Sequence, residues 1–216
     1  MGARVVSWLS CVVVVGLLWA SGASAGSGSR FSAKELKLLA KGELVQRPVV
    51  ESRGELRLIG GTSWQVIDAP PSVVWQALLD TRRYHRMLPQ LAEAKLVRRG
   101  RDARKVWFRH AAGPLDMTYT LDMKINAGER DINFRIDDSR DNSIRAAWGF
   151  YTVRPYEGGR SLLVYAIRAD IGDGLGKSLV RSTVHEWMLK VPWMIKRFVE
   201  GSGRWIYKPA SQVAAR

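Results

Sequence analysis

Cysteine is nearly absent from this chain of 216 residues, and histidine is scarce. The single cysteine, Cys11, excludes an internal disulfide framework and a zinc site built from cysteines. His85, His110 and His185 lie far apart in the sequence, and no closely spaced ligand pair supports a metal site. The second histidine of a zinc-protease helix is also missing, because Leu189 stands in its place. We therefore expect no metal ion and no other cofactor.

Acidic residues are few relative to basic ones. Twenty Asp and Glu against 34 Lys and Arg give a formal net charge of +14 at pH 7, which suits anionic partners. Nucleic-acid binding needs exposed aromatic residues between the basic ones, whereas most aromatic residues here fall on the apolar register of predicted strands and helices. We therefore do not expect nucleic acid as a partner, and an anionic membrane surface is the alternative.

Long apolar runs are missing as well. The longest one, at residues 12–19, is shorter than the roughly 20 residues that span a membrane. Arg4 precedes this run and Ala-Ser-Ala follows it at residues 23–25, which is the pattern of a secretory signal peptide. We predict that residues 1–25 are cleaved and that the mature protein begins at Gly26 and is exported, to the periplasm or outside the cell. A retained N-terminal anchor is the alternative.

Recognisable catalytic motifs are also absent. Residues 172–178 end in Gly-Lys-Ser, but Ile171 occupies the position where a phosphate-binding loop requires glycine. No serine stands in a Gly-x-Ser-x-Gly elbow. Asp116, Asp122 and Asp137 fall on the polar register of strands or at a turn, so we expect solvated carboxylates there. We assign no residue a catalytic role on this basis.

Residues 26–54 are predicted to form an N-terminal arm with one short helix. The helix covers residues 31–41, where Ser32 and Glu35 stand at capping-box positions and Gly42 ends the pattern. The strongly apolar segments begin only later, so we expect this arm to lie on the surface.

From residue 55 onward the pattern indicates one strand, two short helices and a run of further strands. Residues 55–69 predict a long strand with a bulge at Gly60 and Gly61. Residues 72–79 and 81–91 predict the two short helices. Alternating apolar residues joined by short turns then predict antiparallel strands at residues 103–110, 114–125, 132–136, 143–153 and 161–169.

The chain ends in a predicted long helix. Apolar residues recur at helical spacing over residues 179–198. Pro192 is expected to kink this helix, because its ring collides with the carbonyl group of Met188 in a straight one. Residues 205–216 are predicted to form a C-terminal tail.

This order of elements resembles the helix-grip superfamily, the SRPBCC group that includes START lipid-binding domains, polyketide cyclase/dehydrase-like proteins and coenzyme Q-binding proteins. The resemblance covers roughly residues 55–204. It implies an α+β fold in which a curved antiparallel β-sheet wraps around a long C-terminal α-helix, with two short helices after the first strand and an apolar cavity between sheet and helix. The matching residues are Ala69-Pro70, Val74-Trp75, Leu78-Leu79-Asp80, Tyr84 and Leu88-Pro89.

Bulky, adaptable side chains on the predicted strands and the long helix are the candidate ligand-binding residues. The same residue types also fill a dry core, so the prediction of a cavity depends on the resemblance. The candidates are Met117, Tyr119, Phe134, Trp148, Phe150, Tyr165, Trp187, Met188 and Met194.

Three functions fit these features. The first is an exported START-like domain that binds a lipid, quinone or other apolar small molecule, for example for transport. The second is a cyclase- or hydrolase-like enzyme that acts on a hydrophobic substrate in the same cavity, with Arg109, His110 and Tyr165 as the candidate polar groups. The third is an adaptor of the cell envelope whose groove accepts a protein partner.

Overall fold

The computed structural model describes residues 31–113, 115–172 and 178–209. Residues Phe31–Arg216 form one compact unit with its own hydrophobic cores, so we expect this unit to fold without the first 30 residues. The predicted signal peptide and its cleavage site lie outside the described residues. None of the helices described is long and apolar enough to cross a membrane.

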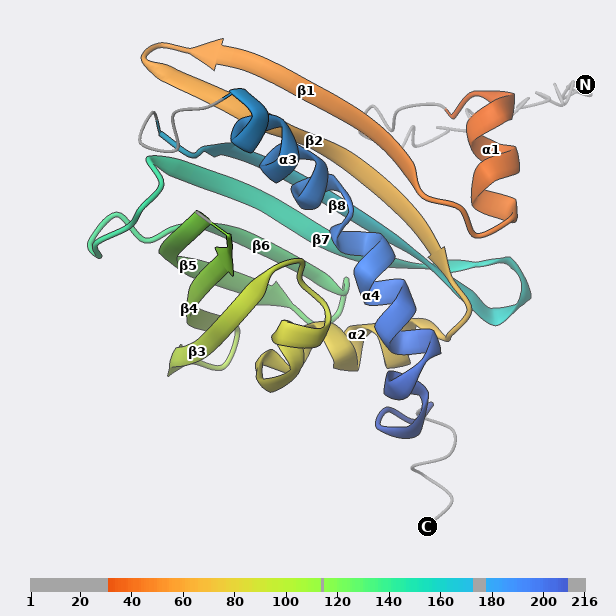
Figure 1. Ribbon diagram of the computed structural model, residues 1–216. Helices are drawn as coiled ribbons and strands as arrows, with labels where there is room; N and C mark the ends of the chain where they lie inside the picture. The colour runs from red at the N-terminus through yellow and green to blue at the C-terminus, as the bar shows by residue number, and fades with distance from the viewer. Residues whose placement is uncertain (1–30, 114, 173–177, 210–216) are drawn as a thin grey trace, which may run out of the picture. The chain divides into compact units, whose positions relative to one another are not determined.

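The unit is built on one curved sheet of eight antiparallel strands (Figure 1). The spatial order is β1-β2-β8-β7-β6-β5-β4-β3. Two of these strands, β1 and β3, were not expected from the sequence. The strands are β1 (Val45–Arg53), β2 (Leu56–Ile67), β3 (Leu91–Arg99), β4 (Ala103–Ala112), β5 (Leu115–Asn126), β6 (Asp131–Ile136), β7 (Ala146–Tyr156) and β8 (Arg160–Asp170).

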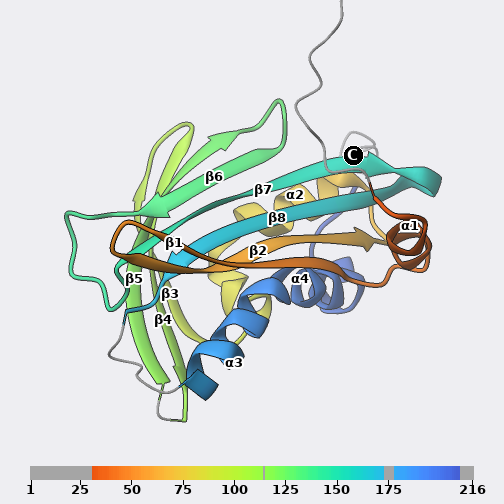
Figure 2. The same cartoon turned by 90° about the horizontal axis from the view of Figure 1, so that it is seen from above.

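The helices follow the predicted order. Two short helices come directly after β2, and the C-terminal helices lie along one side of the sheet, against β2 and β8 (Figure 2). The helix-grip fold predicted from the sequence is thus confirmed. The helices are α1 (Ala33–Ala40), α2 (Pro71–Leu79), α3 (Ser178–Leu189) and α4 (Val191–Glu200), with 3-10 helices η1 (Thr81–Arg86), η2 (Glu157–Gly159) and η3 (Ser202–Trp205).

The expected kink in the C-terminal helix is a complete break. Lys190 lies between α3 and α4, and Pro192 stands in the first turn of α4, where a residue without an N–H group is tolerated. The hydroxyl group of Ser63 on β2 donates a hydrogen bond to the carbonyl oxygen of Leu189 at 2.8 Å. The sheet therefore satisfies a backbone acceptor at the break.

The glycine pair in β2 does not form the predicted bulge, because the pairing register runs without interruption against both β1 and β8. Gly60 and Gly61 have φ values of 147° and 151°, which residues with a side chain rarely adopt. A Cβ atom on Gly61 would lie 2.4 Å from the carbonyl oxygen of Arg47 and 3.0 Å from Cδ2 of Leu189. The glycines therefore allow the helix break and β1 to approach β2 closely.

Residues 45–53, assigned from the sequence to an arm outside the domain, pair with β2 along its length. The predicted capping box of the preceding helix is confirmed, because the Ser32 hydroxyl accepts from the N–H of Glu35 and the Glu35 carboxylate accepts from the N–H of Ser32. α1 covers a small second core on the sheet, separate from the main one. Its fully buried members are Leu39, Val45, Trp64 and Val66.

Candidate functional site

An apolar cavity of about 90 Å³ lies between the sheet and α3. Its wall on the sheet comes from β4, β5, β7 and β8, and its wall on the helices from α3 and the start of α4. The polar side-chain groups in the lining are one imidazole, three tyrosine hydroxyls and one indole N–H. They belong to His110, Tyr119, Tyr151, Tyr165 and Trp187.

Strand alternation sets the shape of the cavity. On β8, Tyr165, Ile167 and Ala169 point to the same face because they are two residues apart, and all three line the cavity. Ala169 lies directly opposite Ala147 on β7. This pair of small side chains leaves the space that the cavity occupies.

Two tyrosines face each other across β7 and β8. Tyr151 pairs with Tyr165 in the register, and their ring centroids are 4.7 Å apart. Burial raises the pKa of both phenols well above the ordinary value. Both hydroxyl groups therefore stay protonated at neutral pH and can act as neutral hydrogen-bond donors.

His110 and Tyr119 form a fixed polar pair in the lining. His110 Nδ1 lies 3.0 Å from the carbonyl oxygen of Pro89, which can only accept, so Nδ1 carries the proton. Burial lowers the pKa of His110, and the ring is neutral at pH 7. Its Nε2 atom therefore accepts from the Tyr119 hydroxyl at 2.9 Å. The Tyr119 oxygen keeps an acceptor site for a ligand hydroxyl group.

Five of the nine predicted ligand-binding residues lie in the lining of this cavity. They are Met117, Tyr119, Tyr165, Trp187 and Met188. Their contact with a ligand stays a prediction. Phe134 is buried in the main core beside Tyr151 and Tyr165, at centroid distances of 5.6 and 6.2 Å, and is not in the lining.

Trp148 and Phe150 lie on the opposite face of the sheet, which corrects the predicted face of β7. The strand predicted from residue 143 begins only at Ala146, so an alternation that includes Ile144 crosses from a loop into the strand. Tyr151 faces the cavity instead, and the guanidinium group of Arg53 lies 6.0 Å from the Trp148 ring. The aromatic residues Trp148 and Phe150 make the outer face of β7 more hydrophobic than its inner face, so hydrophobicity alone favours the wrong face.

Met194, on α4, is also outside the lining. Arg109, a candidate for an enzymatic role, pairs instead with the exposed Asp116 through two hydrogen bonds of 2.6 and 2.9 Å. Tyr151 and the alanine pair were missed by sequence reasoning. The short apolar side chains of the lining carry no signal that distinguishes a cavity wall from a packed core.

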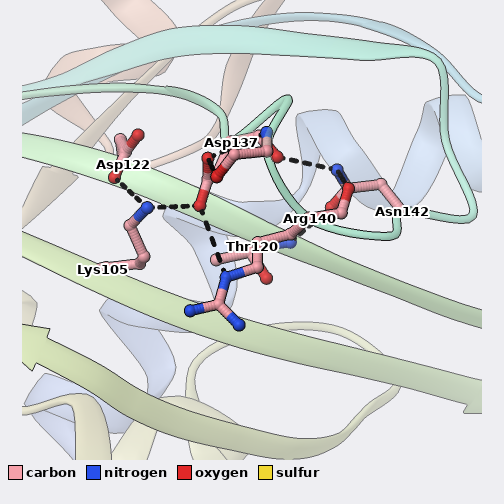
Figure 3. Close-up of polar contacts among 7 residues, drawn as sticks. Lys105, Thr120, Asp122, Asp137, Arg140 and Asn142 are labelled. Carbon is pink, nitrogen blue, oxygen red and sulfur yellow. Dashed lines mark hydrogen bonds and ion pairs between the residues drawn. The ribbon is translucent and has the colours of Figure 1, made fainter.

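Asp137 is not the solvated carboxylate predicted from the sequence. Its side chain is only 6% exposed and contacts the ammonium group of Lys105, which also lies 3.3 Å from Asp122 (Figure 3). The Ser139 hydroxyl donates to the same carboxylate at 2.7 Å. Hydrogen bonding from Lys105 and Ser139 lowers the pKa of Asp137 to about 2, so this carboxylate stays ionised.

Polar contacts around Asp137 hold the loop between β6 and β7 against β5. Asn142 donates to the carbonyl oxygen of Asp137 at 2.9 Å and accepts from the N–H of Thr120 at 2.8 Å (Figure 3). These contacts are structural, and none of these residues lines the cavity. Among the described residues, no group of three or more His, Cys, Asp or Glu side chains could hold a metal ion.

The curved sheet, the gripping helices and the apolar cavity between them define a helix-grip protein. A family model described as "Polyketide cyclase / dehydrase and lipid transport" matches residues 61–210. The match covers more than half of the chain, and the chain belongs to this family. A search of curated proteins found no match.

Solved structures of the same fold include proteins described as enzymes and as lipid-transfer proteins. The Zhui aromatase/cyclase from Streptomyces sp. R1128 has a TM-score of 0.52 and 18% identity over 68% of this chain and 98% of its own. A START superfamily protein from Mycobacterium smegmatis has a TM-score of 0.54 and 12% identity over 66% of this chain and 97% of its own. A STAR-related lipid transfer protein from Xanthomonas axonopodis has a TM-score of 0.51 and 14% identity over 74% of this chain and 98% of its own. At these identities the likeness shows the fold alone.

Proposed function

We propose that this protein is an exported carrier that binds a lipid, quinone or other apolar small molecule in the cavity between the sheet and α3. The observation that supports this proposal most directly is the cavity itself, because its wall is mostly apolar and its few polar groups are neutral. Apolar pockets with a few fixed polar groups are typical of small-molecule sites. The tyrosine hydroxyls and the His110–Tyr119 pair would orient a polar end of the ligand.

Ligand entry is expected to widen the cavity. At about 90 Å³ it is smaller than the roughly 150 Å³ engineered cavity that accepts benzene in another protein. α3 supplies Val184, Trp187 and Met188 to the wall and is separated from α4 by the break at Lys190. A shift of α3 would therefore enlarge the cavity while α4 keeps its place in the core.

A matched pair of substitutions on β8 tests this function. Ala169→Leu places a larger side chain in the cavity, whereas Ala166→Leu places the same side chain on the opposite face of the strand. Native mass spectrometry of co-purified small molecules and retention of an apolar fluorescent ligand are compared for both variants. We expect loss of the ligand in Ala169→Leu only. Equal retention in both variants would place the ligand elsewhere.

A cyclase-like enzyme is the second candidate, and the His110–Tyr119 pair favours it. A neutral imidazole that accepts from a phenol facing an apolar cavity can exchange a proton with a bound substrate through that phenol. Tyr119→Phe should then abolish cyclisation of a poly-β-ketone analogue and leave binding of an apolar fluorescent ligand nearly unchanged. Turnover that survives this substitution would exclude the role of the pair.

A further inference from the structure

Two tryptophans of the C-terminal segment are exposed to solvent. Trp205 in η3 is 83% exposed, more than any other large apolar residue among those described, and Trp193 on α4 is 38% exposed. Exposing an indole ring to water is unfavourable, and solvent-facing tryptophan is typical of surfaces that meet an apolar or interfacial partner.

Basic side chains lie beside the segment that carries Trp205. η1 packs against α4, and its Arg82, Arg83 and Arg86 share a surface hollow with Ile206, the residue that follows Trp205. The side chain of Arg82 is 84% exposed. We call this region the tryptophan–arginine surface. Its members are Arg82, Arg83, Arg86, Arg204 and Trp205.

The acidic groups near this surface are already neutralised. Asp80 pairs with Arg82 at 3.2 Å and with Arg83, and it accepts from the Tyr207 hydroxyl at 3.1 Å. The Glu200 carboxylate pairs with the ammonium group of Lys196 at 2.5 Å. It also accepts a hydrogen bond of 2.7 Å from the backbone N–H of Asp68, which follows β2. The tryptophan–arginine surface therefore carries a net positive charge.

We propose that the tryptophan–arginine surface docks on an anionic lipid bilayer. Tryptophan prefers the boundary between headgroups and acyl chains, and arginines near it are attracted to anionic lipid. A solvent-facing tryptophan among arginines also suits a nucleic-acid base, and the test below therefore includes a single-stranded oligonucleotide. This inference does not depend on the cavity or its ligand.

Flotation with vesicles tests the proposal. The chain from Gly26 is used, since the apolar run before it would itself bind lipid. Vesicles of phosphatidylcholine alone are compared with vesicles of two parts phosphatidylcholine to one part phosphatidylglycerol. We expect binding to the anionic vesicles that weakens with added salt.

Arg82→Gln with Arg86→Gln should lower the partition coefficient about 25-fold, because each basic residue contributes about fivefold. Trp205→Ala should lower it about tenfold or more.

Matched controls separate this surface from general charge and hydrophobicity. Arg53→Gln with Arg140→Gln removes the same charge from the end of β1 and from the β6–β7 loop, and Val50→Ala removes a 70% exposed apolar side chain from β1. Thermal unfolding confirms that each variant is folded. The proposal is overturned if the wild type does not float, if the controls weaken binding equally, or if a single-stranded oligonucleotide binds more tightly through the same residues.

Discussion

At the scale of single residues, the neutral His110 links stability to pH. The unfolded chain binds a proton at this position with the ordinary pKa of about 6.5, whereas burial lowers the pKa in the folded protein. The unfolded state therefore binds more protons as the pH falls below 6.5, and the free energy of unfolding decreases. The carboxylates of Asp137 and Glu35, whose pKa values are lowered to about 2 in the folded protein, add their own loss of stability only below about pH 5, where the unfolded carboxyl groups begin to bind protons.

We expect His110→Gln to remove part of this pH dependence between neutral pH and about pH 5. Urea unfolding across this range measures the slope for the wild type and the variant. His185→Gln is the control, since His185 contacts the carbonyl oxygen of Gly60 outside the His110–Tyr119 pair. An unchanged slope in His110→Gln would show that the imidazole binds a proton equally well in the folded and unfolded states, which contradicts the lowered pKa.

Gly61 provides a second test at this scale. Gly61→Ala places a Cβ atom 2.4 Å from the backbone of β1 and forces a φ of 151° on a residue with a side chain, so we expect a loss of about 2 kcal/mol or more. Gly54 in the β1–β2 turn also has a positive φ, but a Cβ atom there meets nothing within 4 Å. Gly54→Ala should cost only about 1 kcal/mol. Equal losses of unfolding free energy in the two variants, measured by urea unfolding, would contradict the explanation that Gly61 is needed for the close approach of β1 to β2.

At the scale of elements, the break between α3 and α4 separates two functions of the C-terminal segment. Trp187 lies on α3 and lines the cavity, whereas Met194 lies on α4 outside it. Trp187→Ala should destabilise the fold by less than the 3–5 kcal/mol typical of a packed aromatic residue, because space already exists beside the ring. It should also weaken retention of an apolar fluorescent ligand.

Met194→Ala is the matched control for this prediction. We expect it to leave ligand retention unchanged, because Met194 does not line the cavity. A clear loss of ligand in Met194→Ala, measured beside Trp187→Ala in the same assay, would mean that the cavity extends along α4 when it is occupied.

Strand alternation predicted which side chains face the cavity where a strand was long and regular. On β5, Met117 and Tyr119 were placed correctly because the apolar register runs through the whole strand. On β7 the outer face carries Trp148 and Phe150, so hydrophobicity pointed to the wrong face. The edge strand β3 was missed because its exposed residues show little alternation. A cavity is a property of packing between elements, which no local pattern encodes.

At the scale of the whole molecule, the N-terminal segment is predicted to direct export. We expect the exported product to begin at Gly26, because Ala-Ser-Ala precedes it after a short apolar run. Intact mass spectrometry of protein recovered outside the cytoplasm measures the start of the chain. A product that retains residues 1–25 would instead support an N-terminal anchor.

The position of β1 also affects how the sheet ends. β2 is buried along most of its length, and β1 occupies the edge that β2 would otherwise present to other chains. Pro48 interrupts the row of N–H groups on β1, and Arg47 and Arg53 add charge beside it. A fragment that begins at residue 55 would offer the bare backbone of an apolar strand to its neighbours. Self-association into intermolecular β-sheet is the expected fate of such a fragment, and β1 prevents this in the longer chain.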